Sequence, residues 1–290
     1  MQRRSDALGI AGALFYILLW ASAYVPSKIG VLDSSPMWFL VVRFATAGSI
    51  ALAAALIMRA KLPQTRSEWL AVFALGVLGN AVYLGFTYEA LRHLASGVGA
   101  IVASMNPLVL AIVAPYLLRE KLTPLKIGGL VLGFGGVVWV MLARTGSGSA
   151  EPFDVLLAFI GVVGSVAATV VFKKYCGNLD VRMTTALQLL AAGLVLLPFA
   201  PLLDGAPHVT WAPRIIVSFA YVVLAMSMGA SVLWFWLLGR GEASRVSAFY
   251  FLTPIFGLGI AFVLLHEQVG VRDIGGLVAI ALGIFLVQRA

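Results

Sequence analysis

The chain has 290 residues, of which 61% are hydrophobic and only 11% are charged, and its mean hydropathy is +1.01. A soluble domain of this length needs far more charge to cover its surface, so the composition excludes one and predicts an all-α integral membrane protein. The net charge of +8 lies in short clusters between apolar runs, which argues against a nucleic-acid partner, and the single Cys176 excludes an internal disulfide framework.

Apolar runs separated by turn and charge signals predict ten transmembrane helices. Runs of about 20 apolar residues match a hydrocarbon core of ~30 Å at 1.5 Å rise per residue. The predicted spans, in chain order, are 8–31, 37–58, 69–91, 96–118, 124–143, 154–175, 183–203, 212–238, 244–265 and 271–288. A Gly- and Ser-rich stretch separates spans five and six, so we expect one repeat at 1–143, a linker at 144–153 and a second repeat at 154–290.

The distribution of Lys and Arg predicts the orientation in the membrane. With the N-terminus inside, 14 of these residues lie at cytoplasmic ends and loops, 5 lie on the opposite side and Arg43 lies within a span, which accounts for all 20. Cytoplasmic loops of membrane proteins carry an excess of Lys and Arg. Both termini are therefore expected in the cytoplasm.

One stretch of the sequence occurs twice in similar form. The sequence "LLREKLTPLKIGGLV" at 117–131 returns as "LLHEQVGVRDIGGLV" at 264–278, and a shift of 147 residues aligns 107–142 with 254–289 without a gap. Each half contains an odd number of predicted spans, so the two copies cross the membrane in opposite directions. Such inverted five-plus-five repeats are typical of secondary transporters, which bind substrate near the midplane between the halves and work by alternating access.

The motifs that carry this pattern also carry a family resemblance. They are "WASAYVPSKIG" at 20–30, "VVRF" at 41–44, and the E-x₇-G-G-x₆-G pattern of Glu120, Gly129 and Gly136 and of Glu267, Gly276 and Gly283. With these motifs the chain resembles the EamA family of the drug/metabolite transporter superfamily, and within it the bacterial exporters of aromatic amino acids. The resemblance implies ten helices around a central cavity, efflux of small metabolites across the bacterial cytoplasmic (inner) membrane, and no cofactor.

Aromatic and amide side chains inside the spans are the candidate substrate-binding residues. They are Trp20, Tyr24, Asn80, Tyr83, Tyr88, Trp234 and Tyr250. Ring faces would bind an aromatic side chain, and Asn80 or a tyrosine hydroxyl would bind the backbone groups of an amino acid. Asn80 is the strongest candidate because a mid-span amide needs partners that lipid cannot supply. Ser165 and Thr169 are weaker candidates, and any single ring could instead serve packing.

Arg43 is the clearest intramembrane charge. Ionisable groups inside a bilayer are functional candidates because burying one costs at least ~2.5 kcal/mol. We expect Arg43 either to pair with Glu89, which lies at a comparable depth, or to bind a substrate carboxylate. The alternative is that Arg43 extends to the outer membrane interface.

Glycines and prolines recur at matching positions of the two repeats. Gly129 and Gly136, like Gly276 and Gly283, are seven residues apart and so share one helix face, which predicts tight helix packing and leaves a homodimer as the alternative to a monomer. Pro107 and Pro254 fall near the middle of their predicted spans. An interior proline frees a carbonyl and kinks a helix, so these two are candidate hinges.

These observations favour a secondary transporter that exports amino acids, aromatic ones first, with the lipid bilayer as its surroundings. Export of other small metabolites or drugs is the alternative, and a channel is a further one. No clustered polar residues suggest an enzyme, the three histidines are too dispersed for a metal site, and no phosphate-binding loop is present. Since no carboxylate lies mid-span, proton coupling and facilitated efflux both stay open.

Overall fold

The computed structural model describes residues 2–94, 102–144, 151–253, 255–256 and 271–290. Within these residues all regular elements are helices, joined by turns and irregular segments, with one isolated bridge between Ser34 and Val209. The elements are α1 (Gln2–Ser22), α2 (Tyr24–Asp33), α3 (Pro36–Ile57), α4 (Arg66–Gly76), η1 (Val77–Val82), α5 (Tyr83–Ala90), α7 (Asn106–Leu117), α8 (Pro124–Arg144), α9 (Pro152–Val171), η2 (Phe172–Cys176), α10 (Val181–Leu196), α11 (Phe199–Asp204), α12 (Pro213–Tyr221), η3 (Val222–Ala230), α13 (Ser231–Arg240), α14 (Ala243–Ala248), η4 (Phe249–Leu252) and α16 (Val271–Arg289).

Among the described residues, five helical stretches are long and apolar enough to cross a membrane. They are Leu8–Asp33, Pro36–Ile57, Arg66–Ala90, Pro152–Cys176 and Pro213–Arg240, which correspond to predicted spans one, two, three, six and eight. Four shorter apolar helices correspond to spans four, five, seven and ten, and predicted span nine is described only in part, over 244–253 and 255–256. The all-helical membrane fold is therefore confirmed, while the total of ten spans stays a prediction.

The helix boundaries follow local chemistry. Proline occupies the first turn of α3, α7, α9 and α12, where its missing N–H has no intrahelical partner to lose. At the start of α4, the Thr65 side chain accepts from the Glu68 backbone N–H while the Glu68 carboxylate accepts from the Thr65 backbone, forming a capping box. These signals lie in the sequence itself, and the predicted starts of spans two, three and five to ten lie within three residues of the observed ones.

Three predicted spans are wrong as continuous helices. Span one breaks at Ala23 between α1 and α2, because Pro26 three residues later has no N–H to bond the carbonyl of Ser22. Span four is interrupted by a turn directly before α7, so Pro107 starts a new helix instead of kinking the middle of one. Span seven is divided into α10 and α11, with Pro198 in the turn between them.

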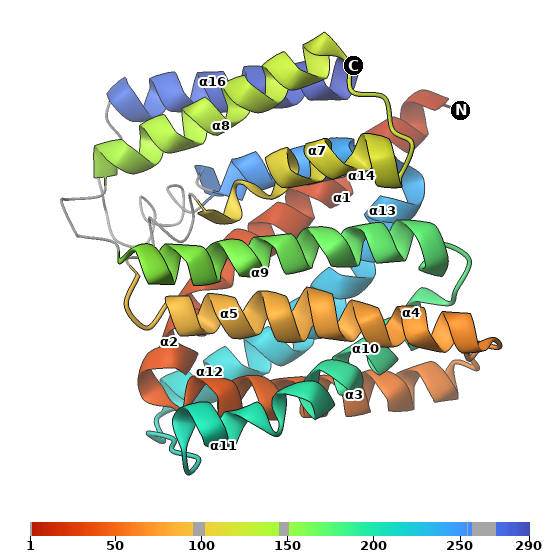
Figure 1. Ribbon diagram of the computed structural model, residues 1–290, viewed down its shortest axis with the longest axis vertical. Coiled ribbons are helices and arrows are strands. Elements are labelled where there is room, and N and C mark those ends of the chain that lie inside the picture. Colours follow the sequence, from red (N-terminus) through yellow and green to blue (C-terminus); the bar gives the residue numbers. More distant parts are fainter. Residues whose placement is uncertain (1, 95–101, 145–150, 254, 257–270) are drawn as a thin grey trace.

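Figure 1 shows the helices running roughly side by side, with both chain termini at the same end of the bundle. At one edge α8 lies along α16, and at the opposite edge α3 packs along α10. These two pairs each join one predicted repeat to the other. Most of the remaining helices lie between these pairs (Figure 1). The apolar core includes side chains of both pairs and of the helices between them, with many aromatic residues.

The four predicted packing glycines lie at the contact of α8 with α16. A methyl group added at Gly129 would lie 2.7 Å from the carbonyl oxygen of Gly283, and one added at Gly136 would lie 2.8 Å from that of Gly276. Such distances are shorter than any real carbon contact, so only glycine permits this approach of the two backbones. The close packing occurs within one chain, and the homodimer stays an untested alternative.

Three of the long helices contain π-helical segments, in which backbone hydrogen bonds span five residues instead of four. These are η1 in the third predicted span, η2 at the end of the sixth and η3 in the eighth. Shifting η1 by the 147 residues that relate the two repeats places it on 224–229, inside η3. The same distortion therefore occurs at the same place in both repeats. π-Helical turns are rare and are frequent at functional sites.

Candidate functional site

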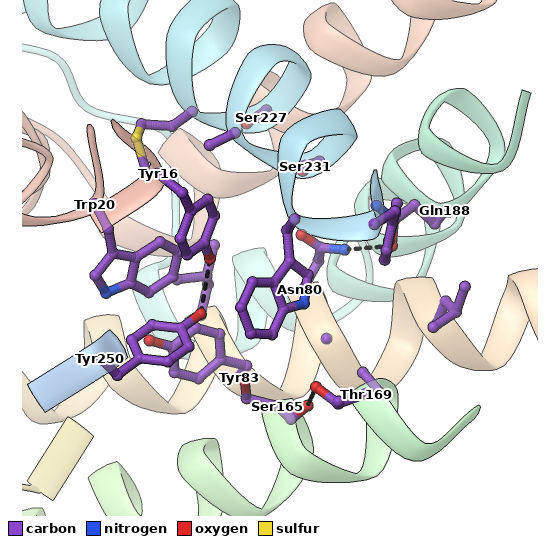
Figure 2. Close-up of a pocket in the computed structure, with 18 of the residues that line it drawn as sticks. Tyr16, Trp20, Asn80, Tyr83, Ser165, Thr169, Gln188, Ser227, Ser231 and Tyr250 are labelled. Atoms are coloured by element: carbon purple, nitrogen blue, oxygen red, sulfur yellow. Dashed lines mark hydrogen bonds between the residues drawn. The ribbon is translucent and has the colours of Figure 1, made fainter. Parts of the chain in front are cut away.

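A cavity of about 90 Å³ lies between the π-helical segments η1 and η3. Its wall combines aromatic rings on one side with amides and hydroxyls on the other (Figure 2). The lining residues are Tyr16, Trp20, Arg43, Leu75, Gly79, Asn80, Tyr83, Leu84, Ser165, Ala168, Thr169, Gln188, Met226, Ser227, Ala230, Ser231, Trp234, Phe235 and Tyr250. Because these residues come from both predicted repeats, the cavity lies where an inverted-repeat transporter is expected to bind its substrate.

Five aromatic residues from four different elements form the apolar wall. Trp20 stacks on Tyr83 with ring centroids 5.9 Å apart, and Tyr16 stacks on Trp234 at 5.0 Å. The ring of Tyr250 meets Trp20 and Trp234 edge-on, and its hydroxyl lies 2.7 Å from that of Tyr16. Pairs of this geometry are favourable beyond their buried area. They hold the rings at fixed angles around the cavity.

The polar wall is centred on Asn80, which lies in η1. Its amide nitrogen donates to the side-chain oxygen of Gln188 on α10, 3.3 Å away. Thr169 and Ser165 of α9 lie beside this amide pair in Figure 2, and the Asn106 amide donates to the Ser165 hydroxyl at 3.0 Å. The mid-span amide thus has the protein partner that a nonpolar surrounding demands.

Arg43 is buried, with 5% of its surface exposed, and it does not extend to the membrane interface. Its Nε donates to the Ser227 hydroxyl at 2.9 Å, and its Nη1 donates to the Tyr88 hydroxyl at 3.2 Å. The expected pair with Glu89 is wrong, because the Glu89 carboxylate is 2.9 Å from the guanidinium of Arg92, one helical turn further along its own chain segment. Arg43 therefore faces the cavity with neutral partners.

A second cavity of about 70 Å³ adjoins the first. The two share Trp20, Arg43, Tyr83, Leu84 and Met226, and Tyr88 belongs to the wall of the second one only. Each is well below the ~300–1,000 Å³ of typical ligand pockets. The shared side chains separate the two cavities in this conformation, so a solute the size of an amino acid requires them to move.

The cavities account for most of the predicted binding residues. Six of them line the first cavity, namely Trp20, Arg43, Asn80, Tyr83, Trp234 and Tyr250. Tyr88 lines the second cavity, and the side chain of Tyr24 lies outside the described part of the structure. Pro254 and Glu267 also lie outside it, so the paired hinge stays a prediction.

Sequence reasoning missed Tyr16, Gln188 and Ser227. Gln188 is a mid-span amide like Asn80, so the same argument would have found it. Ser227 is a small hydroxyl among apolar residues, and Tyr16 is one aromatic residue among many in the first span. Their roles depend on which helices meet, and no local signal marks them.

Polar contacts also join the two repeats at the end of the bundle where the termini lie. The Glu120 carboxylate accepts from the backbone N–H groups of Ala243 at 2.6 Å and Ser244 at 3.2 Å, and also from the Ser244 hydroxyl. The ammonium of Lys126, whose side chain is almost fully buried, donates to Glu242 at 2.9 Å. We call these five residues the clasp. They connect the segment between α7 and α8 to the start of α14.

The contacts within the clasp lower the pKa of one of its residues, Glu242. Partial burial raises the pKa of Glu242, but the hydrogen bond from Lys126 and the positive charges of Lys126 and Arg245 outweigh burial, so the pKa lies below its ordinary value. Arg119, directly before Glu120, has a φ of 57°, an unusual conformation for a residue other than glycine. This turn directs Glu120 toward α14.

The opposite end of the bundle has its own polar contacts. The Arg214 guanidinium binds the buried Asp33 carboxylate through two hydrogen bonds of 2.6 and 2.7 Å. Asp204 accepts from the backbone N–H of Met37 at 2.6 Å and also pairs with Arg92. The described residues thus connect the two repeats on both sides of the cavities. No described group of three or more His, Cys, Asp or Glu side chains could hold a metal ion.

Comparison with known proteins shows which family has this architecture. The model of the EamA-like transporter family matches the chain twice, over residues 7–142 and 153–289. The uncharacterized transporter YvbV of Bacillus subtilis is 27% identical over 275 residues, covering 94% of this chain and 89% of its own length. The uncharacterized inner membrane transporter YedA of Escherichia coli is 28% identical, with coverages of 98% and 90%.

A solved crystal structure of a protein has the same fold. It superposes with a TM-score of 0.80 at 18% identity and covers 98% of this chain and 97% of its own. At this identity the likeness concerns the fold alone. Together with the doubled family match, the aromatic and amide cavity and the apolar helices, the comparisons lead to one conclusion. The chain belongs to the EamA-like transporter family and is a multi-pass membrane transporter.

Proposed function

We propose that this protein exports amino acids, aromatic ones first, across the bacterial cytoplasmic membrane by alternating access between its two repeats. Its termini would lie in the cytoplasm, in keeping with the Lys and Arg distribution. Inner-membrane placement is supported by the printed name of the Escherichia coli relative.

One observation carries the proposal, namely the division of the cavity wall into rings and amides. Tyr16, Trp20, Tyr83, Trp234 and Tyr250 offer ring faces and edges to a planar aromatic side chain. On the other side Asn80 and Gln188 offer both donors and acceptors. An aromatic amino acid presents the same division, with a ring at one end and polar groups at the other.

The small volume of the cavities supports a moving site. In the described conformation the side chains of Trp20 and Met226 stand between the two cavities, and polar contacts join the repeats at both ends. Admission of a substrate therefore has to separate one of these ends. Opening of one end at a time is the behaviour that alternating access requires.

The direct test is a substrate panel on the purified protein in proteoliposomes. We expect saturable counterflow of phenylalanine, tyrosine and tryptophan, with weaker transport of alanine and serine. Flux that rises without saturation would indicate a channel. Saturable transport of a drug or another metabolite, with none of the amino acids, would replace the proposal by its alternative. An imposed pH gradient in the same experiment separates proton coupling from facilitated efflux.

A pair of matched variants tests the site. Trp20→Leu removes a ring from the cavity and should weaken apparent affinity for phenylalanine about tenfold, since an aromatic contact contributes up to ~1.5 kcal/mol beyond its buried area. Trp211→Leu removes an exposed ring that does not line either cavity and should leave the affinity unchanged. Equal effects of the two variants would contradict the assignment of the cavity.

A further inference from the structure

The described walls of the two cavities carry a positive charge and no negative one. Among the described residues that line them, Arg43 is the only charged one. Its hydrogen-bond partners, Ser227 and Tyr88, are neutral hydroxyls, and Glu89, the acidic partner expected from the sequence, pairs with Arg92 instead. The guanidinium therefore carries a full positive charge into the site without a described counter-ion.

A buried guanidinium of this kind is poised to receive an anion. Arginine stays protonated in proteins and holds five N–H donors in a rigid planar fork. The described acceptors use only two of the five, the one on Nε and one on Nη1. Burial of an unpaired charge is unfavourable, and a bound carboxylate relieves it through charge-assisted hydrogen bonds to the remaining donors.

Among the described residues that line the two cavities none is acidic, so an ammonium group has no counter-ion there. The polar wall opposite the rings consists of Asn80, Gln188, Ser165 and Thr169, which are all neutral. Their oxygen atoms can accept hydrogen bonds from either an ammonium or a hydroxyl group. The positive charge of the site therefore selects substrates that have a carboxylate. The amino group can be replaced by another small hydrogen-bond donor, such as a hydroxyl group.

From these contacts we propose that Arg43 is the carboxylate-binding residue of the transporter, and that the site takes aromatic carboxylates as a class. Aromatic 2-hydroxy acids are then substrates alongside the amino acids, whereas amines and carboxamides with the same ring are not. This inference rests on the proposed function, because it names the chemistry by which the same cavity recognises its substrate.

Four compounds with one ring test the proposal by competition against labelled phenylalanine in proteoliposomes. Unlabelled phenylalanine and 3-phenyllactate should compete comparably, and phenylalaninamide and phenethylamine should be weaker by about tenfold or more. Competition by the amide or the amine equal to that of phenylalanine would overturn carboxylate recognition. Failure of 3-phenyllactate beside strong competition by phenylalanine would overturn the interchangeability of the amino group.

Variants of Arg43 test whether this residue binds the carboxylate, independently of which compounds the transporter accepts. Arg43→Gln keeps a donor near Ser227 and Tyr88 but removes the charge, so it should lose the preference for phenylalanine over phenylalaninamide, while Arg43→Lys should keep it. Arg182→Gln, at a partly buried pair with Asp180 that lines neither cavity, serves as the control and should keep the preference. Monodisperse elution and thermal unfolding of each purified variant check that it folds.

The outcomes distinguish this inference from the function on which it rests. Absence of phenylalanine transport by the wild-type protein overturns the proposed function and the inference with it. Normal phenylalanine transport with an unchanged preference in Arg43→Gln overturns the inference alone.

Discussion

At the scale of single residues, the amide pair of Asn80 and Gln188 is the contact that the surroundings make most demanding. The two side chains come from different repeats and meet at 3.3 Å beside the cavity. Neither amide can find a partner in lipid, so each depends on the other and on the polar groups of the cavity. Asn80 could be recognised in advance because an amide in the middle of an apolar span needs an explanation, whereas its partner depends on how α10 packs against η1.

A double-mutant cycle measures this pair. Asn80→Ala and Gln188→Ala should each lower the free energy of unfolding, and the double variant should lose less than the sum, with a coupling of about 0.6–1.7 kcal/mol. The cycle of Asn80→Ala with Thr185→Ala is the control, because the Thr185 hydroxyl has no described partner, and it should be additive. Additivity in both cycles would mean that the hydrogen bond between the Asn80 and Gln188 side chains contributes nothing to stability.

At the scale of helices, the apolar runs, the prolines and the capping box predict where most helices begin, because these signals act within a few residues. The π-helical segments and the breaks at Ala23 and before Asn106 were not predicted. A π-helical turn has no sequence signature of its own, and it persists because neighbouring helices pack around it. For α8 and α16 the sequence predicted only that each helix has a face of small residues. It did not predict that these two faces pack against each other.

The α8–α16 contact provides a matched pair of substitutions. Gly136→Ala places a methyl group 2.8 Å from the Gly276 carbonyl oxygen, so overpacking of about 1–3 kcal/mol should lower the Tm by roughly 2–10 °C. Gly135→Ala meets nothing within 4 Å and should leave the Tm unchanged or slightly higher, since alanine favours helix. Thermal unfolding in detergent compares them, and an equal loss in both variants would contradict the packing.

At the scale of the whole molecule, the clasp of Glu120, Lys126, Glu242, Ala243 and Ser244 connects the two repeats near the termini. The pKa of Glu242 is lowered in the folded protein, so its contribution is present above the ordinary glutamate pKa of ~4.3 and is lost as the pH falls through the lowered value. The clasp is therefore intact at neutral pH, and its opening has to come from movement of the repeats.

Weakening the clasp should favour access to the cavity from the side of the termini. In a Cys176→Ala background with a cysteine at Ser231, Glu120→Gln should increase labelling by an impermeant thiol reagent added on that side. A charge-assisted bond of ~1.5–3 kcal/mol corresponds to about ten- to a hundredfold in the equilibrium. Glu68→Gln is the control, because that carboxylate caps only its own helix. Unchanged labelling in Glu120→Gln would exclude the clasp as a determinant of opening.

The π-helical segment η1 has a consequence for the path through the protein. Cavity-lining residues recur at every fourth position along the third span, as Leu75, Gly79, Tyr83, Thr87 and Leu91. In an uninterrupted α-helix each step of four residues overshoots a full turn by ~40°, so Leu91 would be rotated by about 160° from Leu75. A turn closed by a five-residue hydrogen bond holds more residues, and it offsets part of this rotation. Met226, Ala230 and Trp234 repeat the spacing across η3. Along each helix the stripe of lining side chains is therefore less twisted than it would be on an uninterrupted α-helix, so a solute that advances along the axis of transport meets more nearly the same two faces.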